Sequence, residues 1–470
     1  MLKKFIGDRA FYKRVVAIVL PLILQNTVTN VVSLLDTIMV GSVGTEHMSA
    51  VAIANQLIFI FNLCIFGGMS GAGIFTAQFS GQRNHEGVRH TFRFKMYTAF
   101  AVLAVALTIF LTNGTNLLSS YITEGDGAGD LVKTLHYSEN YLKIMLVGLP
   151  AFALTQVYSG TLRETGETKL PMFASIAAVL TNLVMNYILI FGKLGLPAMG
   201  CEGAAIATVI SRFVELGIVV VVSHRHKSDY PFLIGVYRSL KIPVRLVKSI
   251  IIKGAPLLAN EALWSTGVAM LNQNYSLRGP TIMAAMSISS TIVNIFNVVF
   301  MSMGNAIAIM VGQELGSGEL KRARDVDNKL IFITVASCGV MGALLFLFSP
   351  IIPQFYQTTE EIRALATNFI RVSACFMPLF ACCHASYFTL RSGGKSVITF
   401  IFDSGWMWVI VYPISYILVH FTTLSILPLY ISIQCIDVFK ATLGLTLVAK
   451  GIWVNNLVGE RKEEALPEGK

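Results

Sequence analysis

Three carboxylates stand inside long apolar runs of this sequence: Asp36, Glu261 and Asp403. An ionisable side chain at bilayer depth is costly, so it is usually either paired or functional. The basic residues well inside the runs are few, each toward one end of its run: Arg212, Lys253 and Lys440. A structural pairing therefore stays open, most of all for Asp403, and the alternative is that these acids bind a cation or carry a proton.

Other kinds of chemistry find little support in the residues. The apolar runs hold no His and carboxylate cluster with metal-ligand spacing and no Ser or Cys nucleophile beside a base; His384 is the only His inside a run. No G-x-x-x-x-G-K-[ST] loop is present, which argues against ATP as the energy source. The 7 Cys are scattered, with no disulfide pattern. No cofactor and no resident metal is expected, and the chain is predicted not to be an enzyme.

The elements that must position the acids are transmembrane helices. Of the 470 residues, 54% are hydrophobic and 13% are charged, whereas a soluble domain carries roughly 25% charged residues. A helix needs roughly 20 apolar residues to cross a bilayer. The composition predicts an all-α integral membrane protein with twelve such helices: 15–40, 48–72, 94–113, 138–158, 170–192, 203–223, 249–272, 283–310, 330–353, 364–388, 397–420 and 425–449.

Lys and Arg set the predicted orientation. Most of the 36 basic residues fall at the two termini and in the connectors that follow even-numbered runs, and the connector TNGTNLLSSYITEGDGAGD has none. By the positive-inside rule, both termini are predicted to be cytoplasmic. We expect a multi-pass protein of the cell (plasma or inner) membrane, whose net charge of +10 reflects this topology and not nucleic-acid binding.

The two halves of the chain repeat one design. Pro21 matches Pro256, and the same offset pairs Asn26 with Glu261, Gly44 with Gly279, Asn62 with Asn297, Gln78 with Gln313, and Gly81 with Gly316. The repeat predicts two six-helix halves related by a pseudo-two-fold axis along the membrane normal. The expected divisions are an N-terminal lobe 1–223, a basic connector 224–248, a C-terminal lobe 249–454 and a polar tail 455–470.

Several segments resemble those of multidrug and toxic compound extrusion (MATE) transporters. They are LLDTIMVGSVGTEHMSAVAIANQ, AQFSGQRN, TLRETGETKLPMFASIAAVLTNLVMNYILIFG and GAAIATVISR. The resemblance covers both halves, up to about Val454. It implies a transporter that exports organic cations and other amphipathic compounds in exchange for Na⁺ or H⁺.

The resemblance also implies partners for Asp36. In MATE-like proteins an acid on the first helix lies among polar residues of the fifth and sixth helices, which here are Asn182, Asn186 and Thr208. The two Asn are four residues apart and share one helix face. Such oxygen-rich sites suit Na⁺ or a transferable proton. This chain has Asn186 where the family's best-known version has a second acid, which weakens the case for Na⁺. The alternative is that the two Asn only form hydrogen bonds between helices.

In the second half, Glu261 occupies the place that Asn26 has in the first. Acids on the seventh helix recur in NorM-like branches of the family, paired with an Asp on the tenth helix. Here the tenth run has no acid, so the candidate partner is Asp403 on the eleventh. Two carboxylates close together can share one proton. Whether Glu261 and Asp403 form one site is left open by the sequence.

Substrate binding is assigned to Asn26, Trp264, Phe296 and Phe300. Aromatic and Met side chains accept many shapes and attract organic cations. Phe59, Phe61, Trp406 and Trp408 lie near the same sites. For any single aromatic residue, packing against lipid or protein is the favoured interpretation.

The predicted function is secondary-active multidrug efflux by rocking of two lobes, coupled to H⁺ or Na⁺. The expected partners are amphipathic organic cations and the lipid bilayer, with no nucleic acid, and the protein is expected to be a monomer. A lipid-linked oligosaccharide flippase is the alternative, but it needs basic cavity residues and this interior is predicted to be acidic. A membrane-embedded enzyme is less favoured, and no run has the polar stripe of a channel.

Overall fold

The computed structural model describes residues 5–121 and 130–459, and these residues form helices joined by short connectors, with no β-strand among them. Each predicted apolar run except the ninth lies in a helix to within one residue, and most of these helices extend several residues beyond the run at one or both ends. The first six are α1 (Arg9–Gly41), α2 (Thr45–Gly81), α3 (His85–Ser119), α4 (Leu131–Glu164), α5 (Lys169–Phe191) and α6 (Gly200–Arg225).

The second six repeat the pattern with one composite member. They are α7 (Val244–Ser276), α8 (Pro280–Gly316), α9 (Leu320–Phe348), α10 (Glu360–Ser392), a helix over Ser396–Phe421 and α13 (Ile426–Ala449). The composite helix consists of α11 (Ser396–Phe400), two π-helical segments, η4 (Ile401–Gly405) and η5 (Met407–Val411), and α12 (Tyr412–Phe421). The all-α architecture of twelve helices in two halves is confirmed.

Eleven of these helices are, in the described part of the chain, both long and apolar enough to cross a membrane. The remaining one, α7, has the length but carries Lys253, Asn260 and Glu261 within its middle turns. Because such residues are expensive in lipid, they must face protein or water. The one long helix that misses this criterion therefore carries one of the predicted site residues.

Helix ends follow local sequence rules that recur in both halves. Gly44 and Gly279 stand directly before α2 and α8 with φ of 157° and 121°. Glycine adopts such angles without the strain that a side chain would cause.

The predicted ninth run, 330–353, is wrong at its carboxyl end, because α9 stops at Phe348 and Pro353 lies in a separate 3₁₀ turn, Ile352–Phe355. Proline cannot supply the N–H that would continue the helix.

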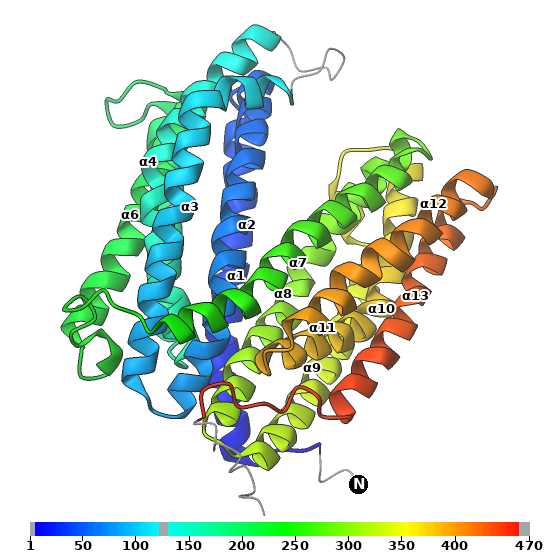
Figure 1. Ribbon diagram of the computed structural model, residues 1–470. Coiled ribbons are helices and arrows are strands. Elements are labelled where there is room, and N and C mark those ends of the chain that lie inside the picture. Colours follow the sequence, from blue (N-terminus) through cyan, green and yellow to red (C-terminus); the bar gives the residue numbers. More distant parts are fainter. Residues whose placement is uncertain (1–4, 122–129, 460–470) are drawn as a thin grey trace, which may run out of the picture.

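Figure 1 shows the two halves as two bundles that meet at one end and diverge toward the other. The end where they meet carries the amino-terminal part of α1, the connectors after α2 and α4, and residues 450–459; we call it the terminal face. Between the bundles, Gly71 of α2 packs directly on Gly254 of α7. The absence of side chains at this crossing lets the two backbones approach closely.

The connector between the halves is held against the first bundle. It contains a short 3₁₀ turn, η2 (Pro231–Leu233), and its carbonyl oxygens at Gly235, Val236 and Lys241 accept hydrogen bonds from the buried guanidinium of Arg93 on α3. At the other end of the chain, residues 455–459 contact α2, and residues 460–470 of the predicted tail lie outside the described part. The acid-rich connector at 122–129 lies outside it as well.

Candidate ion-coupling site and inter-lobe contacts

The four residues predicted around Asp36 come together inside the first bundle. Asn186 of α5 donates a hydrogen bond of 2.6 Å from Nδ2 to Asp36 Oδ1 on α1. The same nitrogen lies 3.1 Å from Asn182 Oδ1, one turn earlier on α5. Thr208 Oγ1 of α6 lies 3.3 Å from the Asn182 amide. Three helices therefore deliver a carboxylate, two amides and a hydroxyl to one point.

The Asn182 amide fits this cluster better with its oxygen and nitrogen exchanged. In that orientation the nitrogen donates to both carboxylate oxygens of Asp36, at 3.0 Å each, and the amide oxygen accepts from Thr208 at 3.3 Å, while the bond from Asn186 Nδ2 to Asn182 Oδ1 is lost. The exchange removes the repulsion between an amide oxygen and an ionised carboxylate. Two amide nitrogens then surround Asp36, as an ionised acid requires.

The charge of Asp36 has no cationic partner among the described residues, since no Lys, Arg or His nitrogen lies within 4.0 Å of it. Asn182 and Asn186 are 6% and 1% exposed, so the cluster is shielded from solvent on the α5 side. Asn186 Oδ1 is buried and accepts no hydrogen bond. The site thus combines an uncompensated charge with an unused oxygen ligand.

In the second bundle, Asp403 is paired, which was the structural alternative left open by the sequence. Lys440 of α13 donates from Nζ to Asp403 Oδ1 at 2.8 Å. Asn260 of α7 donates to Asp403 Oδ2 at 3.1 Å, and Ser404 Oγ donates to Asn260 Oδ1 at 2.7 Å. The pair is largely buried, with side chains 14% and 18% exposed. Asp403 therefore stands in the second bundle as half of an ion pair.

Glu261 lies beside this network without joining the ion pair. Tyr387 of α10 lies close enough to the Glu261 carboxylate to act on it, and it receives a 3.3 Å hydrogen bond from Asn260. Arg391 and Asp403 are both close enough to act on Glu261 electrostatically. Asn260 thus bonds both to Asp403 and to Tyr387 beside Glu261, and no direct hydrogen bond between the two acids occurs in the described residues.

Sequence reasoning missed Asn260 and Tyr387 and gave Lys440 too little weight. Lys440 was described as lying toward one end of the run 425–449, although that run and α13 both continue to residue 449, more than two turns further. The spacing alone gave a usable signal, because a lysine nine residues inside a membrane helix needs a counter-charge. Asn260 gave no such signal, because an uncharged amide in a membrane helix does not require a counter-charge.

The bundles are joined at the terminal face by contacts that obey the internal repeat. Gln78 Nε2 of α2 donates to the Ser392 carbonyl at the end of α10 at 3.0 Å. Gln313 Nε2 of α8 donates to the Glu164 carbonyl at the end of α4 at 3.2 Å. Repeat-related glutamines thus make the same hydrogen bond in opposite directions across the interface.

Repeat-related glycines complete this contact. A Cβ atom on Gly81 would lie 1.9 Å from the Gln313 carbonyl oxygen, and one on Gly316 would lie 1.9 Å from the Gln78 carbonyl oxygen. The carboxyl-terminal segment adds a further contact, because Leu457 N donates a hydrogen bond of 2.7 Å to Gln78 Oε1. We call the reciprocal contacts of Gln78, Gly81, Gln313 and Gly316 the inter-lobe seal.

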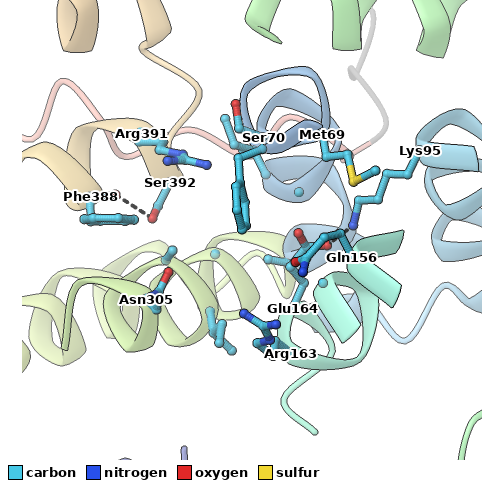
Figure 2. A pocket seen from close by; sticks show the side chains of 18 residues that line it. Met69, Ser70, Lys95, Gln156, Arg163, Glu164, Asn305, Phe388, Arg391 and Ser392 are labelled. Atoms are coloured by element: carbon cyan, nitrogen blue, oxygen red, sulfur yellow. Dashed lines mark hydrogen bonds and ion pairs between the residues drawn. The ribbon is translucent and has the colours of Figure 1, made fainter. Parts of the chain in front are cut away.

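A cavity of about 170 Å³ lies between the bundles near the seal. Figure 2 shows it lined from α2, α3 and α4 on one side and from α8 and α10 on the other. Lys95, Arg163 and Arg391 reach it, with Glu164 as its acid. The prediction of an acidic interior is therefore wrong for this cavity. Lys95, Arg163 and Arg391 lie near the ends of their helices, where the sequence does not distinguish a residue of the interior from one of a connector.

The comparisons with known proteins agree with this architecture. A family model described as MatE matches residues 21–188 and 256–417, one stretch in each half. The chain belongs to the MatE family. The expectation of a transporter family and not an enzyme is thereby confirmed.

Several bacterial MATE relatives span nearly the same length. A probable multidrug resistance protein YoeA of Bacillus subtilis is 26% identical, over 87% of this chain and 88% of its own. A probable multidrug resistance protein NorM of Thermotoga maritima is 24% identical, over 96% and 95%. A solved structure described as the outward-facing conformation of a multidrug resistance MATE family transporter of the MOP superfamily has a TM-score of 0.82 and 20% identity, covering 96% of this chain and 97% of that one.

The four residues predicted to bind substrate do not meet in the inter-lobe cavity of this MATE protein. Asn26 donates to Ser302 Oγ at 3.4 Å and so ties α1 to α8. Phe296 packs with the second bundle's core, and Phe300 lies edge-on to His384, with centroids 5.0 Å apart. Trp264 is 43% exposed. Packing accounts for the two Phe residues, and the substrate role of all four stays a prediction.

Proposed function

We propose that this MATE protein is a secondary-active multidrug efflux antiporter, which exports amphipathic, mostly cationic compounds in exchange for H⁺ or Na⁺. The observation that carries the proposal is the contrast between two membrane acids. Asp403 has Lys440 as a counter-charge, whereas Asp36 has only amides and a hydroxyl around it. An acid without a fixed counter-charge is free to take up and release a cation, and we assign ion coupling to Asp36.

The amides around Asp36 give the site two states. With their nitrogens toward the carboxylate, Asn182 and Asn186 stabilise the ionised acid. When Asp36 gains a proton it becomes a donor, and an amide must turn its oxygen toward it. Na⁺ needs the same turn, because it takes oxygen ligands. The unpaired Asn186 Oδ1 is available for either event.

The arrangement of the lobes supports alternating access. They are sealed at the terminal face and diverge toward the opposite one. With the terminal face cytoplasmic, as the Lys and Arg distribution predicts, this is the conformation that releases substrate outward. Rocking the lobes about their contact would open the seal and expose the interior to the cytoplasm.

The test is efflux of a fluorescent organic cation from proteoliposomes, with pH and Na⁺ gradients imposed separately. Transport that follows the pH gradient alone identifies H⁺, and transport that follows Na⁺ alone identifies Na⁺. Asp36→Asn, which preserves volume and most hydrogen bonds, is expected to abolish gradient-driven efflux while the protein still folds. Wild-type efflux by Asp36→Asn would remove Asp36 from the mechanism, and no efflux under either gradient would refute the antiport itself.

A further inference from the structure

The cavity between the lobes is lined by two arginines that the internal repeat makes equivalent. Arg163 belongs to TLRETGETK at the end of α4, and Arg391 belongs to TLRSGGKS at the end of α10. Each therefore comes from a different lobe. Figure 2 shows the two guanidinium groups at one cavity, approaching it from separate helices.

Neither arginine has an ion-pair partner within 4.0 Å in the described part of the chain, and Arg163 Nε is buried without a hydrogen-bond partner. The acid of the cavity, Glu164, is already engaged by Lys95, which is 1% exposed and also donates to Thr161 Oγ1 at 3.2 Å. The cavity therefore retains two positive charges that its own acid does not neutralise.

Two further acids act on the arginines from outside the cavity. Glu215 of α6 acts electrostatically on Arg163, as Glu164 also does, and Glu261 of α7 acts on Arg391. Neither forms an ion pair with its arginine or lines the cavity. They weaken the electrostatic field of the arginines at long range, but no described acid bonds to the guanidinium N–H groups, which can therefore bind an anion directly.

The remaining lining suits a small polar group attached to an apolar one. Gln156 and Asn305 add amides, while Phe66, Met69 and Ile309 give apolar walls. The volume of about 170 Å³ is small beside the several hundred Å³ of a pocket for a drug-sized ligand. It is adequate for a headgroup, with any longer apolar part left outside.

We propose that this cavity binds the phosphate or carboxylate headgroup of an amphipathic molecule between Arg163 of one lobe and Arg391 of the other. Guanidinium groups recognise such oxyanions by paired, charge-assisted hydrogen bonds. An anion held from both lobes also ties them together beside the inter-lobe seal, so it stabilises the conformation that is closed at the terminal face. The binding site stands on its own and does not depend on the proposed antiport.

The test is isothermal titration of the purified full chain in a neutral maltoside detergent. The probes are hexyl phosphate and hexanoate, with inorganic phosphate to represent a free anion and hexyltrimethylammonium as the cation of equal chain length. The wild type is expected to bind the two amphipathic anions more tightly than the matched cation. Arg163→Gln and Arg391→Gln should each weaken anion binding by about 10- to 100-fold. Arg163→Lys and Arg391→Lys should retain part of the affinity, because the charge stays.

The matched control is Arg371→Gln, an equal change of charge on α10 at a side chain that bonds Ser349 Oγ and does not line the cavity. It should bind the anions as the wild type does. Unliganded melting temperatures show that every variant is folded. Equal affinity for anion and cation, or wild-type anion binding by both glutamine variants, would overturn the proposal.

A lipid source is distinguished by repeating the titration in nanodiscs. Loss of hexyl phosphate binding in phosphatidylglycerol but not in phosphatidylcholine discs would identify an anionic lipid headgroup as the occupant. Equal binding in both would identify a free amphipathic anion. Either result supports the site, since both require the arginines.

Discussion

Adding one methyl group to the inter-lobe seal should shift the protein away from the conformation described here. A Cβ on Gly81 would stand 1.9 Å from the Gln313 carbonyl oxygen, with the Gln313 carbonyl carbon and Cα also within 2.8 Å. These are backbone atoms of α8, so no side chain can turn aside. A normal carbon–oxygen contact is about 3.3 Å, and the lobes would have to separate by more than about 1 Å to accept Gly81→Ala.

The separation would break hydrogen bonds that span the interface. Those from Gln313 Nε2 to the Glu164 carbonyl and from Gln78 Nε2 to the Ser392 carbonyl are 3.2 and 3.0 Å long. At about 1 kcal/mol for each bond, and with the lost packing at the glycine contact, we expect a shift of about 2–4 kcal/mol. That corresponds to a change of about 30- to 1000-fold in the ratio of the closed to the open terminal face.

The assay is a distance measurement between spin labels in a Cys-free background. Labels at Val132, near the start of α4, and at Phe421, at the end of α12, are both well exposed and lie on the two lobes at the face opposite the seal. Gly81→Ala and Gly316→Ala should each shorten this distance as the lobes rock. Gly217→Ala on α6, where a Cβ meets nothing within 4 Å, is the control. Unchanged distance distributions in both seal variants would refute this account of the interface.

Three further predictions use the same structure. Lys440→Met should destabilise the protein by about 3–5 kcal/mol in thermal unfolding, because it leaves Asp403 buried without a counter-charge. The double variant Lys440→Met with Asp403→Leu should recover most of that loss. Equal stability of the single and double variants would contradict the pairing. Truncation after Val454 removes the Leu457 and Asn456 bonds to Gln78 and Gly316, so the spin-label distance should again shorten, and an unchanged distance would show that the chain end does not hold the seal. Cysteines at 132 and 230 should react from opposite sides of the membrane with an impermeant reagent, external and cytoplasmic respectively, and labelling from one side only would refute the predicted topology.

The sequence alone determined the helices, their repeat and the acids inside them. Apolar composition over about 20 residues is a local property, and the backbone N–H and C=O groups of a helix in lipid must bond within that helix. Each membrane-spanning segment can therefore be predicted separately. The Gly44 and Gly279 helix starts are equally local. The grouping of Asp36 with Asn182, Asn186 and Thr208 came from the family resemblance, and the structure brings these residues together.

Only the tertiary structure decided which charges are paired and which are free. Asp36 and Asp403 look alike in sequence, yet one faces amides and the other faces Lys440. The difference depends on which helices pack against each other and on their rotation, and an apolar run records neither. The same reason hid the cavity of Arg163 and Arg391, since residues at the ends of helices from different halves meet only when the two lobes close.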